Sequence, residues 1–185
     1  MNVIKEGLSH FGRAYWGLPD HKTKTEQSFD RSELYFKWGN ESGETDDFIQ
    51  ALHGLEDLDP DELTFKDNLH RHERILNCIV EILRLKLRDI AEVFEFLCDH
   101  RAKIELRSLD FKQQLFDCIT TFIDEEETFF SQGERIKTSL ADLDLEETFK
   151  SERKEMLERY DRQSEEIVEG LKAFYARVKE YANKG

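Results

Sequence analysis

Histidines and carboxylates are the residues of this 185-residue chain that could hold a metal ion. His70 follows Asp67 by three positions, the spacing at which two ligands share one face of a helix. A metal site in a helical bundle needs a matching pair on another helix, and the chain contains no Glu-x-x-His sequence. We therefore expect no metal and no other cofactor, and we predict that His72, which lies among apolar residues, is a core or interface histidine.

The serines and cysteines show no pattern typical of a catalytic nucleophile. No serine lies in a Gly-x-Ser-x-Gly turn, and no glycine-rich loop is present that would hold phosphate groups. Cys78, Cys98 and Cys118 lie twenty residues apart in apolar surroundings, which indicates buried, reduced thiols rather than disulfides or zinc ligands. The sequence therefore predicts that the protein is not an enzyme.

The charge balance of the chain is strongly acidic. Acidic residues outnumber basic ones by 41 to 27, which gives a formal net charge of -14. Such a chain repels the phosphates of nucleic acids, so we expect no binding to DNA or RNA. The sharpest acidic run is a candidate surface for a basic protein partner, with a solvated helix face as the alternative; it comprises Asp124, Glu125, Glu126 and Glu127.

Basic residues gather in the middle of the chain. They are candidates for contact with an anionic membrane or with a partner protein, and the five are Arg84, Lys86, Arg88, Arg101 and Lys103. The first three alternate with leucines, so on a helix they point in several directions. A helix surface solvated through salt bridges is therefore the alternative interpretation.

Long helices are the elements that must position these residues. From Asp61 onward the chain has no proline and few glycines, so little in it would stop a helix. Apolar residues advance by threes and fours through a coiled-coil-like seam, which comprises His72, Leu76, Ile79, Leu83, Leu87, Ile90, Phe94 and Leu97. Further apolar residues widen this seam, so we expect it to pack against more than one neighbour; they are Ile75, Val80, Ile82, Val93 and Phe96.

The first 60 residues differ from the rest, because they hold both prolines and six of the nine glycines. We predict an all-α protein in which residues 1–60 form an irregular segment with short helices, packed on a bundle of two to four long helices made by residues 61–185. Within the first segment, Thr45 is expected to cap a helix that carries Phe48 and Leu52. Pro60 is expected to begin the next element.

A phenylalanine-rich stretch in the second half resembles the end of the last long helix in BAR domains, most closely those of Arf- and Rho-type GTPase-activating proteins. The residues that carry the resemblance are Leu115, Phe116, Ile119, Phe122, Ile123, Phe129, Phe130, Gly133 and Leu140. The resemblance implies a long helix that ends at the glycine, in a three-helix coiled coil that dimerises antiparallel and holds anionic membrane on a basic surface.

Three of these phenylalanines are candidates for a helix interface. Phe129 and Phe130 are adjacent, so they lie about 100° apart on a helix. Both can be buried only where the helix is covered from two sides or packs in a dimer. We expect them, with Phe122, to be helix-interface residues.

The function that these features favour is a non-catalytic, BAR-like helical scaffold that forms a homodimer and docks membranes or partner proteins. The alternative is a soluble acidic binding protein, such as an inhibitor, immunity or adaptor factor, that acts on a basic protein partner. No stretch approaches about 20 consecutive apolar residues, and the first residues lack the order of a signal peptide. We therefore expect a cytoplasmic protein, in contact with membranes at most peripherally.

Overall fold

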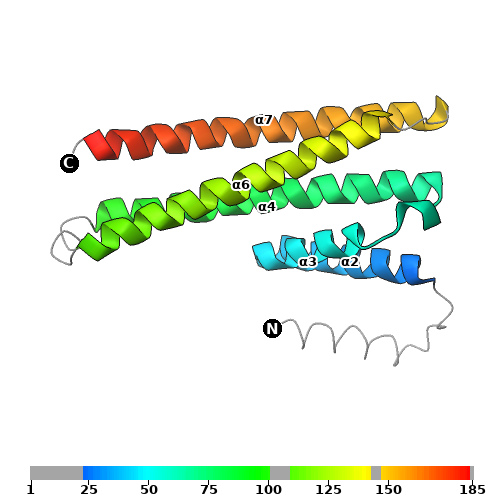
Figure 1. Ribbon diagram of the computed structural model, residues 1–185, viewed down its shortest axis with the longest axis horizontal. Helices are drawn as coiled ribbons and strands as arrows, with labels where there is room; N and C mark the ends of the chain where they lie inside the picture. The colour runs from blue at the N-terminus through cyan, green and yellow to red at the C-terminus, as the bar shows by residue number, and fades with distance from the viewer. Residues whose placement is uncertain (1–22, 101–108, 143–146, 184–185) are drawn as a thin grey trace, which may run out of the picture.

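The computed structural model describes residues 23–100, 109–142 and 147–183, and nearly all of these residues are helical. The elements, shown in Figure 1, are α2 (Lys24–Ser42), α3 (Thr45–Glu56), the short 3-10 helix η1 (Pro60–Glu62), α4 (Phe65–Asp99), α6 (Leu109–Asp142) and α7 (Glu147–Asn183). The described ranges contain no strand, which confirms the predicted all-α class. Three long helices of 35, 34 and 37 residues follow residue 61, within the predicted number.

Helix α4 lies in the middle of the molecule. Figure 1 shows α6 crossing α4 obliquely towards α7, while α2 and α3 form a helical hairpin on the opposite side of α4. We call α2 and α3 together the hairpin. The long helix α4 thus packs against more than one neighbour, as the width of its apolar seam predicts.

Helix α2 is set by strong local signals at both ends. Thr23 and Glu26 cap its start reciprocally, because the Thr23 hydroxyl accepts from the Glu26 N–H (3.2 Å) and the Glu26 carboxylate accepts from the Thr23 N–H (2.7 Å). Gly43 ends the helix with a φ of 67°, a left-handed conformation that favours glycine. These signals explain why the chain from Lys24 is a regular 19-residue helix rather than part of an irregular segment.

The start of α3 differs in detail from the expected one. Glu44 occupies the cap position, and Thr45 is the first helical residue, so the expectation that Thr45 caps this helix is wrong. Two acids in the first turn, Asp46 and Asp47, still favour a helix start here, because they face the positive end of the helix dipole. Pro60 begins η1 as expected, and the Asp59 carboxylate accepts a hydrogen bond from the Asp61 N–H (3.0 Å).

Gly133 lies inside α6 and does not end it, contrary to what the BAR resemblance implies. The helix continues nine residues further, to Asp142. A Cβ atom added at Gly133 would collide with the hydroxyl of Tyr160 on α7 and lie 2.9 Å from its Cζ atom. Glycine is therefore needed here for the close approach of two helices rather than for termination.

The apolar core lies on both sides of α4. On the hairpin side, Phe48 is buried and meets Phe36 edge to face, with ring centroids 5.3 Å apart. On the other side, Phe174 of α7 contacts Phe94 of α4 and Phe122 of α6, with centroid distances of 5.8 and 6.3 Å. Most of the predicted seam is buried among these groups, namely His72, Leu76, Ile79, Leu83, Ile90 and Phe94.

Val93 and Phe96, which were expected to widen the seam, are exposed. Their relative exposures are 44% and 59%. Both follow Arg88, whose guanidinium donates to the carbonyl of Gly43 at the tip of the hairpin (3.4 Å). The hairpin therefore ends before it reaches these two side chains. It covers the same side of α4 nearer to the start of that helix.

Candidate functional site

The exposed end of α4 is the first candidate site. Four large apolar side chains are exposed in the described part of the chain, and two of them, Val93 and Phe96, lie within one turn of α4. We call the surface formed by Asp89, Glu92, Val93 and Phe96 the α4 shoulder.

The α4 shoulder continues the stripe of α4 that packs on the hairpin. At 100° per residue, Arg71, Cys78, Leu85 and Phe96 fall within about 40° of one another. The first of these, Arg71, donates from Nε to the carbonyl of Leu55 in α3 (2.6 Å), which fixes the direction of the stripe. Cys78 and Leu85 are buried along it, whereas Phe96 is exposed about 16 Å beyond Leu85 because the hairpin does not extend that far.

The charged groups of the α4 shoulder are mainly acidic. Asp89 and Glu92 are both exposed, and they share one guanidinium, since Arg88 lies 2.9 Å from the Asp89 carboxylate and 3.9 Å from that of Glu92. Phe96 stacks on the ring of His100, with centroids 4.2 Å apart, which holds the exposed ring against the helix. Among the described residues, the result is an apolar centre with a net negative rim.

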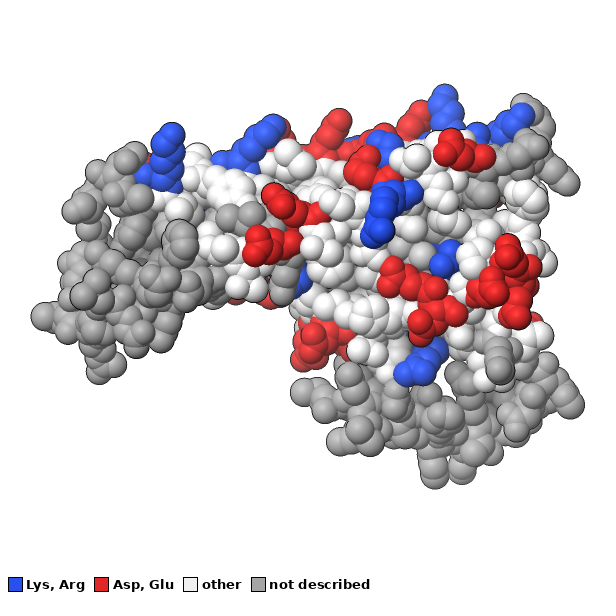
Figure 2. Space-filling view, in the orientation of Figure 1, with Lys and Arg blue, Asp and Glu red and all other residues white. Residues whose placement is uncertain are grey.

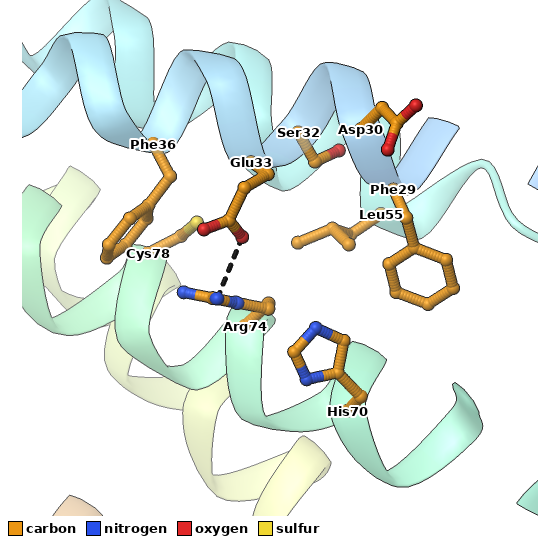
Figure 3. Close-up of a pocket in the computed structure, with 9 residues that line it drawn as sticks. All are labelled: Phe29, Asp30, Ser32, Glu33, Phe36, Leu55, His70, Arg74 and Cys78. Atoms are coloured by element: carbon orange, nitrogen blue, oxygen red, sulfur yellow. Dashed lines mark ion pairs between the residues drawn. The ribbon is translucent and has the colours of Figure 1, made fainter. Parts of the chain in front are cut away.

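A cavity of about 300 Å³ between α2, α3 and α4 is the second candidate site. Figure 3 shows its lining residues, which are Phe29, Asp30, Ser32, Glu33, Phe36, Leu55, His70, Arg74 and Cys78. The Arg74 guanidinium pairs with the Glu33 carboxylate (2.8 Å) and lies over the Phe36 ring, 5.6 Å from its centroid. The His70 ring packs against Phe29 at a centroid distance of 5.6 Å.

Two polar atoms of residues that line the cavity are closed off from solvent and have no hydrogen-bond partner among the described residues. They are the hydroxyl oxygen of Ser32, a residue only 3% exposed, and the Nε atom of Arg74. Cys78 also lines the cavity, but burial raises the pKa of its thiol to about 12. A thiol that stays protonated is a poor nucleophile, so the cavity is suited to binding rather than to thiol chemistry.

The three described basic residues among those singled out from the sequence do not form one surface. Arg84 is paired with Glu81 (2.6 Å), and Arg88 is held at the hairpin tip. Lys86 is half-buried and lies about 200° around the helix from Arg84. Arg101 and Lys103 lie outside the described residues. On the face shown in Figure 2, basic and acidic side chains are mixed.

The acidic run and the interface phenylalanines lie on α6. Asp124 and Glu127 are exposed, while the side chains of Glu125 and Glu126 lie outside the description. Phe122 is buried against Phe174, and two half-buried rings pack on the core further along the helix; these are Phe129 and Phe130.

The spacing of Asp67 and His70 reflects local structure rather than a shared ligand. Asp67 lies in the first turn of α4, where its N–H donates to the cap residue Thr64 (3.2 Å), whereas His70 faces Phe29 and Glu73. In the described ranges, no three His, Cys, Asp or Glu side chains converge in a way that could hold a metal ion. None of the described helices is both long enough and apolar enough to cross a membrane.

Comparison of the chain with protein-family models, with curated proteins and with solved structures finds no match in any of the three. The features of the structure that bear on function are therefore the α4 shoulder and the cavity, and neither was predicted from the sequence. One signal for the α4 shoulder was present: the apolar stripe of α4 is longer than a helix of 12 residues, such as α3, can cover. The cavity has no comparable signal, because three separate helices contribute to it.

Proposed function

We propose that the protein is a non-catalytic helical adaptor whose α4 shoulder binds a basic amphipathic helix of a partner protein. The observation that carries this proposal is the apolar stripe of α4, which continues past the hairpin to the exposed side chains of Val93 and Phe96. An apolar strip on one helix, left open beside the end of a shorter hairpin, suits a partner helix with apolar residues at every third or fourth position.

Charge favours a basic partner helix over the two other molecules that could cover the α4 shoulder, namely a second copy of the chain and an anionic membrane. The rim of the α4 shoulder carries Asp89 and Glu92 against one Arg88, and the whole chain has a net charge of -14. Opposite charge on the partner would speed association and help to select it.

A second copy of the chain and an anionic membrane are the occupants that a BAR-like scaffold would use, and charge disfavours both. In a two-fold contact the same patch meets itself, so the acidic rim of one copy would face an identical rim. An anionic bilayer attracts clustered Lys and Arg, whereas Arg84 and Arg88 are already paired with carboxylates.

The direct test is fluorescence anisotropy with a labelled peptide that has leucine at helical spacing and lysine elsewhere. The Phe96→Ser variant removes the centre of the α4 shoulder. The matched control is Phe65→Ser, since Phe65 is 56% exposed at the opposite end of the same helix. We expect Phe96→Ser to weaken peptide binding at least about tenfold and Phe65→Ser to leave it unchanged. Binding should also weaken as salt is added.

Three results would contradict the proposal. The first is equal affinity of the two variants, or equal binding of a peptide with glutamate in place of lysine. The second is a concentration-dependent dimer in light scattering that Phe96→Ser dissociates, which would make a second copy the occupant. The third is co-sedimentation with vesicles of anionic lipid that Phe96→Ser abolishes, which would assign the α4 shoulder to membranes.

A further inference from the structure

The Phe96 ring of the α4 shoulder has one covered face and one open face. The His100 imidazole covers the first, since the two rings stack at a centroid distance of 4.2 Å with an angle of 25° between their planes. His100 is held in this position, because its Nδ1 atom lies 2.8 Å from the Phe96 carbonyl oxygen. Phe96 is nevertheless 59% exposed, so the face turned away from His100 is the one open to a binding partner.

A carboxylate lies one helical turn from the open face. Glu92 precedes Phe96 by four residues and His100 follows it by four, so Glu92 and His100 lie on opposite sides of the ring along α4. Arg88 is only a loose partner for Glu92, because its Nε atom lies 3.9 Å from that carboxylate but its Nη2 atom lies 2.9 Å from the carboxylate of Asp89. An exposed ring beside an exposed carboxylate suits a cationic side chain better than another apolar one.

The contact between α2 and α4 already contains this combination of groups with a cation in place. Figure 3 shows Arg74 of α4 facing Phe36 and Glu33 of α2. The guanidinium carbon lies 5.6 Å from the centroid of the Phe36 ring, and Nη2 lies 2.8 Å from the Glu33 carboxylate. Phe36 follows Glu33 by three positions and Phe96 follows Glu92 by four, so each helix presents a ring and a carboxylate on one face. No guanidinium of a described residue lies over the Phe96 ring.

We propose that an arginine side chain of the partner helix stacks on the open face of Phe96 and pairs with Glu92. This inference rests on the proposed function, because the partner helix brings the arginine to the α4 shoulder. A guanidinium is planar, so it can lie flat on the ring and still donate hydrogen bonds from its edge to the carboxylate. The compact ammonium of lysine has no such plane, and arginine is therefore the preferred basic residue at this point of the partner.

The experiment measures fluorescence anisotropy of the full-length protein with two labelled peptides of equal charge. Both have leucine at helical spacing, and their basic positions carry arginine in one peptide and lysine in the other. We expect the arginine peptide to bind about threefold to fivefold more tightly, the ratio that one exposed cation–π contact gives. Phe96→Leu keeps an apolar side chain but has no ring, so it should abolish this preference. Phe96→Trp keeps an aromatic face and should bind the arginine peptide at least as tightly as the wild-type protein.

A second variant tests the carboxylate. Glu92→Gln should weaken binding of the arginine peptide about twofold to fivefold. The matched control is Glu155→Gln, which removes the same charge from an exposed position on α7 and should change the affinity less than about twofold.

The outcomes separate this inference from the proposed function. The inference is overturned if Phe96→Leu keeps the preference for arginine, if Phe96→Trp binds more weakly than Phe96→Leu, or if Glu92→Gln binds like Glu155→Gln. The proposed function still stands in those cases, provided that Phe96→Ser weakens binding of both peptides. If Phe96→Ser binds both peptides like the wild-type protein, the proposed function itself fails.

Discussion

The two sides of α4 are covered by helices of different length and different chemistry. On one side lie α6 and α7, with 34 and 37 residues, and on the other lies the hairpin, with helices of 19 and 12 residues. The contact with α6 and α7 reaches Phe94, where three aromatic rings meet. The contact with the hairpin stops near Arg88.

The chemistry of the hairpin side is more polar. Arg71 and Arg74 reach from α4 to a carbonyl of α3 and a carboxylate of α2, and Ser32 is buried beside the cavity. Both candidate sites, the α4 shoulder and the cavity, therefore lie on the side with the shorter cover. The fully covered side of α4 offers no surface to a partner, so the proposed function places binding on the hairpin side, while the contact with α6 and α7 contributes buried aromatic core.

The largest expected effect comes from two phenylalanines two residues apart on α4. Phe94→Ala should lower the free energy of unfolding by about 3 to 5 kcal/mol, because it removes a buried ring that contacts Phe174. Phe96→Ala should change it by less than about 1 kcal/mol, because the ring is mostly exposed. Denaturant titration of both variants measures the two changes in the free energy of unfolding. Similar changes would mean that Phe96 is buried as deeply as Phe94.

A smaller effect is expected where α6 meets α7. Gly133→Ala should cost about 1 to 3 kcal/mol, because the new Cβ collides with the Tyr160 hydroxyl, a loss only partly offset by the better helix propensity of alanine. Adding Tyr160→Phe in the same chain removes the colliding oxygen and should restore part of the stability, since the 2.9 Å contact with the Cζ atom remains. Thermal unfolding of the single and double variants checks this, and an additive loss would show that the helices do not approach closely at Gly133.

The smallest expected effect is a pH dependence that comes from His72. Burial lowers the pKa of His72; the hydrogen bond between its Nδ1 and the Asn68 carbonyl oxygen (2.7 Å) raises the pKa, and the charge of Arg71 lowers it. The unfolded chain, with a histidine pKa of about 6.5, takes up the proton first on acidification. The contribution of His72 to stability is thus complete above about pH 6.5 and is lost as the pH falls from there through the lower pKa of the folded state.

Denaturant titrations between about pH 7.5 and 5.5, one unit either side of the unfolded pKa, measure this dependence as a slope. The His72→Gln variant should show a flatter slope than the wild-type protein. The matched control is His70→Gln, since His70 lies two positions earlier on the same helix and is about half exposed. Equal slopes in all three proteins would show that His72 is not the group responsible.

Local signals in the amino-acid sequence were sufficient to predict the helical class and much of the helix pattern. The three-and-four spacing of apolar residues marks α4, and the proline at position 60 marks the start of η1. These properties depend on residues within one or two turns of each other, so they are present in the chain before it folds. The prolines and glycines of the first 60 residues predicted an irregular segment, whereas the capping residues Thr23 and Glu26 are a local signal for the regular helix α2.

Only the tertiary structure decided which apolar positions are covered. Val93 and Phe96 belong to the same apolar pattern as Phe94, yet they are exposed because the hairpin ends near Arg88. Gly133 looks like a helix end in the sequence and is instead a point of contact with Tyr160, 27 positions further along. The cavity likewise exists only where three helices meet. Periodicity along one helix defines its faces, but the segments that reach each face are set by contacts between residues far apart in the chain.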